Sequence, residues 1–171
     1  IILEKAHGLN PHVLQLALTA YHKLRGEGYD KQRVLTIVDY SKPSTKRRLW
    51  VINLNDLNVP FHELVAQGKN SGLKYATQFS NAPRSLESSI GVYLTGRTYE
   101  GEHGYSMRLN GLEKGFNDNA YSRRVVVHGA WYVEPQYIKE SGRAGRSWGC
   151  PSIALHGSST GKTRPSMPAG R

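Results

Sequence analysis

The sequence predicts a mainly β protein of the α+β class, with a β-sandwich or mixed sheets and a few helices. Three observations support this class. One amphipathic helix is expected near the start, short runs rich in β-branched and aromatic residues follow it, and no long helices alternate with those runs. Such alternation is typical of a parallel α/β sheet, so the pattern argues against that class.

The N-terminal helix is expected over about residues 11–25. Asn10 is a good N-cap, and Pro11 suits the first helical position. Gly26 and Gly28 end the pattern. Between these signals, apolar residues recur at helical spacing and form one stripe: Val13, Leu14, Ala17, Leu18, Tyr21 and Leu24.

The expected strands are short runs bounded by Gly, Pro, Asn or Ser. They cover Val34–Tyr40, Leu49–Leu54, Phe61–Ala66, Lys74–Phe79, Gly91–Tyr99, Tyr105–Leu109 and Arg124–His128. A short helix over Pro135–Glu140 precedes the loop that holds the single cysteine. Residues 154–171 are rich in Gly, Ser, Thr, Pro and basic residues, so we expect one domain over 1–153 and a disordered or non-native tail over 154–171.

Composition excludes several classes of protein. One cysteine among 171 residues excludes an internal disulfide framework and a Cys-rich metal site. No apolar run approaches the roughly 18 residues needed to span a bilayer. The net charge of +10 favours either an anionic partner or a solvated basic surface, with basic clusters at Lys46–Arg48, Arg123–Arg124 and Arg143–Arg146.

Two motifs that suggest other chemistries are incomplete. His62-Glu63 begins like the zinc-protease motif H-E-x-x-H, but Ala66 stands where the second metal ligand is required. The segment from Gly157 to Thr163 is one residue short of a phosphate-binding loop. We therefore predict no metal centre and no nucleotide site.

Cys150 is the candidate nucleophile. It lies in a Gly-rich loop with nearby arginines, which favour a thiolate, although a buried structural cysteine is the alternative. A cysteine nucleophile needs a base. His128 follows an apolar strand and precedes Gly129, and His103 is a second candidate on a more flexible loop. For each histidine a purely structural role is the alternative.

These residues belong to a set of motifs that resembles the L,D-transpeptidase catalytic domain, the YkuD-type murein cross-linking enzymes. The resemblance covers about Leu9 to Ile153. Its motifs are Val127-His128-Gly129, Ser147-Trp148-Gly149-Cys150-Pro151, Asp39-Tyr40-Ser41, Phe79-Ser80-Asn81, Ser88-Ser89-Ile90-Gly91, Tyr99-Glu100-Gly101-Glu102-His103-Gly104 and Gly115-Phe116-Asn117-Asp118-Asn119-Ala120.

The resemblance implies a β-rich fold in which the cysteine loop faces the end of the histidine strand. It also implies two acyl transfers. Cys150 attacks the carbonyl at the L-centre of diaminopimelate in a tetrapeptide stem and releases D-alanine. The side-chain amine of a second stem then resolves the thioester and forms a 3→3 cross-link. His128 would carry the protons.

Further roles follow from the same resemblance. The Gly129 carbonyl would orient His128, and the backbone N–H groups of Gly149 and Cys150 would form the oxyanion hole. Neither a metal nor an organic cofactor is required. Trp131 would wall the peptide groove or pack in the core. The residues expected to contact substrate are Ser147, Trp148, Arg146 and His103.

The implied partners are peptidoglycan stem peptides, with no nucleic acid and no membrane-spanning segment, and we expect a monomer in the bacterial periplasm or cell envelope that reacts with carbapenems. The chain begins at Ile1 and shows no signal peptide. Two departures from the family pattern stand out. Gln67 stands where a histidine is expected, and the likeness ends near Ile153, which would leave an open sheet edge.

Two alternative functions remain open from the sequence. An L,D-carboxypeptidase would use the same cysteine chemistry with water as the acceptor. A non-catalytic basic module would hold cell-wall polymer or nucleic acid by charge, and its binding would weaken strongly with salt.

Overall fold

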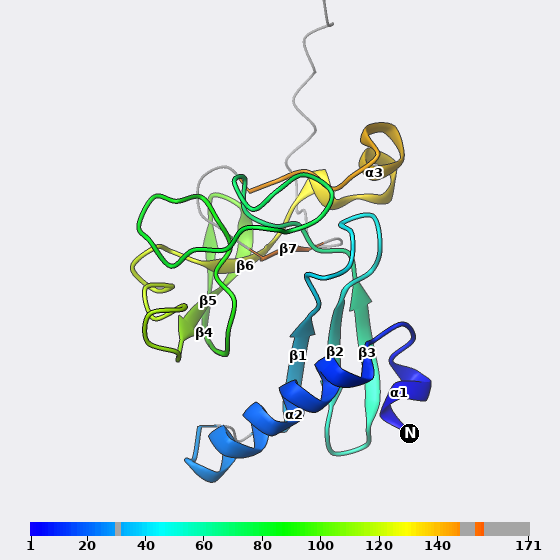
Figure 1. Ribbon diagram of the computed structural model, residues 1–171, viewed down its shortest axis with the longest axis vertical. Coiled ribbons are helices and arrows are strands. Elements are labelled where there is room, and N and C mark those ends of the chain that lie inside the picture. Colours follow the sequence, from blue (N-terminus) through cyan, green and yellow to red (C-terminus); the bar gives the residue numbers. More distant parts are fainter. Residues whose placement is uncertain (30–31, 148–152, 156–171) are drawn as a thin grey trace, which may run out of the picture.

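The computed structural model describes residues 1–29, 32–147 and 153–155. Its strands form two small sheets, ordered β1-β2-β3 and β4-β5-β6-β7 (Figure 1). Strand pairs are antiparallel except for β6 and β7. The mainly β, α+β class predicted from the sequence is therefore confirmed. Within the described part of the chain, no helix is long and apolar enough to cross a membrane.

The first sheet carries the N-terminal helices. Its strands are β1 (Val34–Val38), β2 (Leu49–Asn53) and β3 (Asn58–Glu63), and its helices are α1 (Ile2–Lys5) and α2 (Pro11–Gly26). The predicted cap is present, because the Asn10 side chain accepts a hydrogen bond of 2.8 Å from the backbone N–H of His12. The predicted N-terminal helix is therefore confirmed.

An aliphatic and aromatic core joins α2 to this sheet. Ile37 and Trp50 are directly paired across β1 and β2, so their side chains share one face of the sheet. Trp50 and Ile52 are fully buried, and Leu14 of α2 packs in the same cluster. Burial of apolar surface, at about 25 cal/mol per Å², holds this half of the molecule together.

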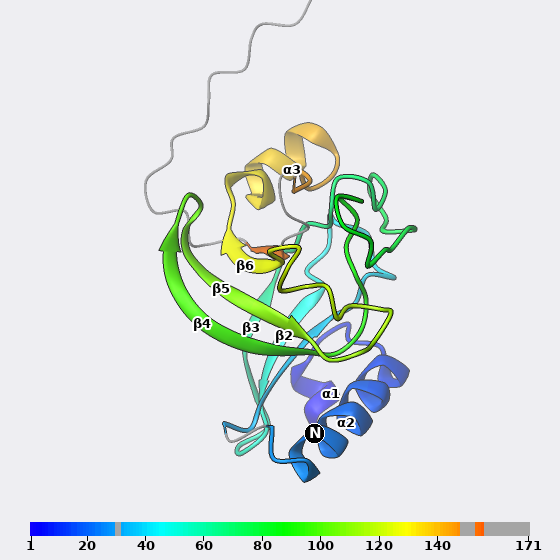
Figure 2. The same cartoon turned by 90° about the vertical axis from the view of Figure 1, so that its left-hand side faces the viewer.

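The second sheet holds the candidate site. Its strands are β4 (Tyr93–Gly101), β5 (Gly104–Gly111), β6 (Val126–Gly129) and β7 (Ile153–Leu155). Strands β4 and β5 form a long curved hairpin beside β6 (Figure 2). A 3₁₀ turn, η1 (Trp131–Val133), and helix α3 (Pro135–Ser141) follow β6. The predicted short helix before the cysteine loop is confirmed.

Two predicted strands were wrong in position or kind. Lys74–Phe79 is not a strand, because the N–H groups of Thr77 and Gln78 both donate to the Ser71 carbonyl and close a turn instead of joining a ladder. The strand expected over Phe61–Ala66 begins earlier, at Asn58. Its apolar end leaves the sheet, where Leu64 and Ala66 pack with Val133, Ile138 and Ala144.

Strand β7 was not predicted. It pairs with β6 in parallel and places Ile153, Ala154 and Leu155 opposite Val127, His128 and Gly129. A partner strand therefore covers this edge of β6. Ala154 and Leu155, the first residues of the expected tail, belong to this strand, and residues 156–171 lie outside the described part of the chain.

Candidate active site

His128 lies where a rigid strand ends. β-Branched Val126 and Val127 place it in β6, between Ser106 of β5 and Ala154 of β7. Its side chain is 4% exposed. A histidine held by two neighbouring strands has a fixed orientation, which suits a group that must meet a reacting atom.

The hydrogen bonds of His128 define its protonation. Its Nδ1 lies 2.7 Å from the Gly129 carbonyl oxygen. A carbonyl only accepts, so Nδ1 carries the proton and, in the neutral ring, Nε2 offers a lone pair. Nε2 is buried and has no hydrogen-bond partner among the described residues. The ring is therefore arranged to accept a proton at Nε2.

His103 covers the His128 ring. It lies in the turn between β4 and β5, and the two rings stack with centroids 4.5 Å apart and planes 22° apart. His103 itself is exposed. Burial lowers the pKa of His128 below its ordinary 6.5, the hydrogen bond to Gly129 opposes this shift, and the nearby His103 adds to it. His128 is therefore a neutral base at neutral pH.

The predicted nucleophile, Cys150, lies outside the described residues. So do Gly149, the other predicted member of the oxyanion hole, and Trp148. The chain is described on both sides of them. Ser147 forms an isolated parallel bridge with Gly68, and Ile153 pairs with Val127.

Ser147 is fixed by backbone and side-chain contacts. Its N–H donates to the Gln67 carbonyl at 3.2 Å, and its carbonyl accepts from the N–H of Lys69 at 3.1 Å. Burial raises the pKa of Tyr132 to about 12, and a side-chain hydrogen bond with Ser147 partly opposes that shift. The predicted substrate contact Ser147 is thus 5% exposed and packed beside Tyr132.

Two glycines allow the chain to pass closely on either side of Ser147. A Cβ on Gly145 would lie 2.5 Å from Cβ of Tyr132, and one on Gly68 would lie 2.5 Å from the Leu86 carbonyl oxygen. Both distances are below any normal contact, so neither position accepts a side chain without movement. Arg146 is half-buried and donates to the Lys69 carbonyl at 2.8 Å.

The Gln67 side chain is held by hydrogen bonds to neighbouring residues of the fold. It is fully buried, its side-chain oxygen accepts from the Arg48 guanidinium, and its amide donates to the Leu73 carbonyl at 3.1 Å. Arg48 also donates to the carbonyls of Val65 and Lys42. Burial lowers the pKa of Arg48 to about 10. Gln67 and Arg48 therefore fix the chain beneath Ser147, and Arg48 is not part of a solvated basic surface.

A second buried arginine organises the loop over residues 80–89. The Arg123 guanidinium donates to the carbonyls of Ser80 and Glu87, at 2.6 Å each, and to the hydroxyls of Ser85 and Ser89, at 2.9 and 2.5 Å. This arginine is 9% exposed. No local pattern indicates this role, because the partners of Arg123 lie 34 to 43 residues away in the chain.

The motif residues Asn81, Asp118 and Asn119 join two loops. Asn81 Nδ2 donates to an Asp118 carboxylate oxygen at 2.7 Å, while the Asn119 N–H and side-chain amide donate to the side-chain and backbone oxygens of Asn81, each at 3.1 Å. Asn117 is fully buried and donates to the Val92 carbonyl at 2.9 Å. These motif residues therefore hold the loops beside the second sheet.

Trp131 and Trp148 were both considered as residues that contact the substrate. Trp131 is half-buried and packs edge to face against Tyr132 and Tyr137, with ring centroids 5.7 and 5.3 Å apart. Its contacts are with the neighbouring Tyr132 of η1 and with Tyr137 of α3. Trp148 lies outside the described residues.

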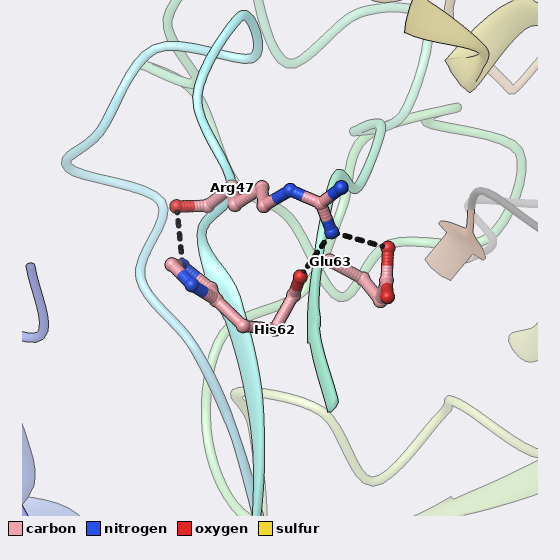
Figure 3. A network of polar contacts seen from close by, with 3 residues as sticks. All are labelled: Arg47, His62 and Glu63. Atoms are coloured by element: carbon pink, nitrogen blue, oxygen red, sulfur yellow. Dashed lines mark hydrogen bonds and ion pairs between the residues drawn. The ribbon is translucent and has the colours of Figure 1, made fainter. Parts of the chain in front are cut away.

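The incomplete zinc motif forms part of a strand. His62 and Glu63 are the last residues of β3, and Figure 3 shows how they meet Arg47. The His62 ring lies 3.2 Å from the Arg47 carbonyl oxygen and stacks on Trp50, while Glu63 accepts from the Arg47 guanidinium at 3.0 Å. Among the described residues, no three His, Cys, Asp or Glu side chains gather as metal ligands.

The fold and site define a class of protein: a small β-rich domain with an oriented histidine at a strand end and a single cysteine in the chain. The family model of the L,D-transpeptidase catalytic domain matches residues 5–160 of the chain. The chain therefore belongs to the L,D-transpeptidase catalytic domain family. The match continues past Ile153, where the likeness was expected to end. Comparisons with curated proteins and with solved structures returned no significant match.

Proposed function

We propose that the protein is a peptidoglycan L,D-transpeptidase that forms 3→3 cross-links through an acyl-enzyme on Cys150. The observation that carries the proposal is the state of His128: Nδ1–H is held by the Gly129 carbonyl, and the buried Nε2 is left as the proton acceptor. Family membership supports the substrate, since the domain acts on peptidoglycan.

The chain on either side of Cys150 supports its pairing with His128. Cys150 precedes Ile153 by three residues, and Ile153 pairs with the residue before His128. Three residues of chain span at most about 10 Å. The rigid bridge at Ser147 stands the same number of residues before Cys150.

The proposed reaction balances through one proton carrier. Nε2 of His128 takes the Cys150 proton as the sulfur attacks the carbonyl at the L-centre of diaminopimelate. The tetrahedral adduct collapses to a thioester, and the imidazolium returns the proton to the departing amine of D-alanine. The second stem's amine then attacks the thioester, gives up a proton through His128, and restores the thiol.

The remaining expected site residues belong to this proposal. The N–H groups of Gly149 and Cys150 would bind the oxyanion. Trp148, Ser147, Arg146 and His103 would contact the stem peptide. The exposure of His103 and its stacking on His128 support a contact close to the reacting carbonyl. The +10 charge suits a substrate with carboxylates, and we place the protein in the periplasm or cell envelope as a monomer.

Intact-mass measurement with a carbapenem tests the nucleophile. We expect the wild type to gain the mass of one carbapenem, with the adduct on Cys150, and Cys150→Ala to gain none. His128→Ala should react much more slowly, because its thiol lacks the base. A wild type that stays unmodified would contradict a reactive Cys150.

The product tests the acceptor. Incubation with tetrapeptide muropeptides should release D-alanine and give dimers whose mass matches a 3→3 cross-link. Tripeptide monomers alone would instead identify an L,D-carboxypeptidase. Salt-dependent binding to cell-wall polymer that persists in Cys150→Ala, with no product of either kind, would identify a non-catalytic module.

A further inference from the structure

Arg108 lies over two tyrosine rings on the second sheet. Its guanidinium carbon lies 4.9 Å from the centroid of Tyr99 and 5.5 Å from the centroid of Tyr121. Both distances are within the range of a cation–π contact. Arg108 belongs to β5, Tyr99 to β4, and Tyr121 to the loop before β6, so three segments fix one cation.

This cation shares a face of the sheet with His128. Tyr99 pairs with Ser106, and Ser106 pairs with His128, so these three side chains point to one side. Arg108 is two residues beyond Ser106 and therefore points to the same side. It is the diagonal neighbour of His128, a separation of about 7–8 Å between Cα atoms.

The hydrogen-bonding edge of Arg108 is not used by the described residues. Arg47 pairs with Glu63, and Arg48 and Arg123 donate to several carbonyls, whereas Arg108 makes no hydrogen bond or ion pair within the described part of the chain. A cation–π contact does not consume the N–H donors of a guanidinium, so its planar N–H edge stays available. Such an edge binds a carboxylate through two parallel hydrogen bonds.

We propose that Arg108 binds a carboxylate of the donor stem peptide. This inference rests on the proposed function, which defines the donor. The donor carries a terminal carboxylate on D-alanine, one residue beyond the carbonyl that Cys150 attacks, and another on the side chain of diaminopimelate. Either lies close enough to the reacting carbonyl to meet a cation beside His128. Tyr99 and Tyr121 hold the guanidinium in place before substrate arrives.

The test compares Arg108→Gln with Arg97→Gln. Arg97 is an exposed arginine on the neighbouring strand β4, so its loss removes the same charge from the same hairpin. Three synthetic donors are used: the free tetrapeptide, its C-terminal amide, and the amide at the side-chain carboxyl of diaminopimelate. D-Alanine or D-alaninamide release gives kcat/KM, and the alkylation rate of Cys150 by iodoacetamide reports an intact site without a substrate carboxylate.

We expect Arg108→Gln to lower kcat/KM for the free tetrapeptide about 10- to 100-fold, mainly through KM, and to leave alkylation unchanged. With the wild type, one of the two amide donors should show a kcat/KM lower than that of the free tetrapeptide by a similar factor. Arg108→Gln should cause no further loss on that donor, and this identifies the carboxylate that Arg108 binds. Arg97→Gln should match the wild type.

Two results would overturn the assignment. Equal losses on all three donors, or no loss on any, would show that Arg108 binds no carboxylate of the donor. A wild type that alkylates normally yet releases no D-alanine from the free tetrapeptide would overturn the proposed function, and this inference with it.

Discussion

The two sheets are stabilised in different ways. Around β1, β2 and β3 the buried residues are mostly apolar, and Trp50, Ile52 and Leu14 form one cluster with α2. Around β4 to β7 many buried groups are polar, among them Ser106, Asn117, Arg123 and His128. A hydrophobic core tolerates small displacements, whereas a hydrogen-bonded network fixes directions. The site lies in the half that fixes directions, and the other half serves as its support.

The largest expected effect lies in the polar half. His128→Ala should lower the rate of D-alanine release about 10²- to 10⁴-fold, because it removes the buried Nε2 that is arranged to accept the proton. Circular dichroism and the free energy of unfolding should change little by comparison. His128→Gln is a control of closer shape that also lacks a base. A variant of either kind that kept wild-type turnover would remove His128 from the mechanism.

The apolar half is tested by Trp50→Ala. Trp50 is fully buried, and its loss should lower the free energy of unfolding by about 3–5 kcal/mol, measured by urea denaturation. Leu16→Ala, on the exposed side of α2, is the control and should stay within about 0.5 kcal/mol. Folded Trp50→Ala should still react with a carbapenem at the wild-type rate. A carbapenem reaction rate that falls together with the free energy of unfolding would show that the site depends on the apolar core of the first sheet.

The loop network is tested by Arg123→Gln. The change removes donors from two carbonyls and two hydroxyls, so the free energy of unfolding should fall by about 1–3 kcal/mol. Arg124→Gln removes the same charge from an exposed neighbour and should change it by less than about 0.5 kcal/mol. Hydrogen exchange over residues 80–89 should rise in Arg123→Gln alone. Equal changes in unfolding free energy and hydrogen exchange in the two variants would show that Arg123 does not hold the loop.

The same contrast explains what the sequence could predict. Helix α2 was predicted because its cap, its apolar stripe and its terminal glycines are all local signals. The expected strand over Lys74–Phe79 failed because β-rich composition does not supply a partner strand. Strand β7 was missed because three residues carry little pattern, and its pairing depends on a β6 that lies far away in sequence.

The site was predicted in part. His128 at a strand end and its orientation by Gly129 were predicted from a local pattern and a family resemblance; the structure shows the strand and the 2.7 Å contact, and the catalytic role of His128 stays a prediction. The arginines could not be sorted by sequence. Arg47, Arg48, Arg108 and Arg123 look alike as charges, yet one is exposed, two are buried among carbonyls and one lies over two tyrosine rings. Only the fold assigns their partners.

The smallest expected effect is on the pKa of His128, which His103 influences. Among the described residues, His128 is packed by β5 and β7 and covered by His103, and His103 is the titratable group whose charge acts on it. The folded pKa of His128 lies below 6.5, so the base stays neutral at pH 6.5, and the acid limb of kcat/KM should fall below that pH. The unfolded chain takes up this proton first, so His128 contributes to a loss of stability as pH falls below 6.5.

Removing His103 should partly reverse both the low position of the acid limb and the contribution of His128 to the loss of stability at low pH. His103→Ala removes a like charge and uncovers the ring, and both changes raise the pKa of His128, so the acid limb should move to higher pH. His103→Phe keeps the ring covered and removes only the charge, so its shift should be smaller in the same direction. The pKa of His128, followed by NMR of its ring protons, and the pH profile of kcat/KM should move together. A limb that stays in place while the NMR pKa rises would show that the limb reports a group other than His128.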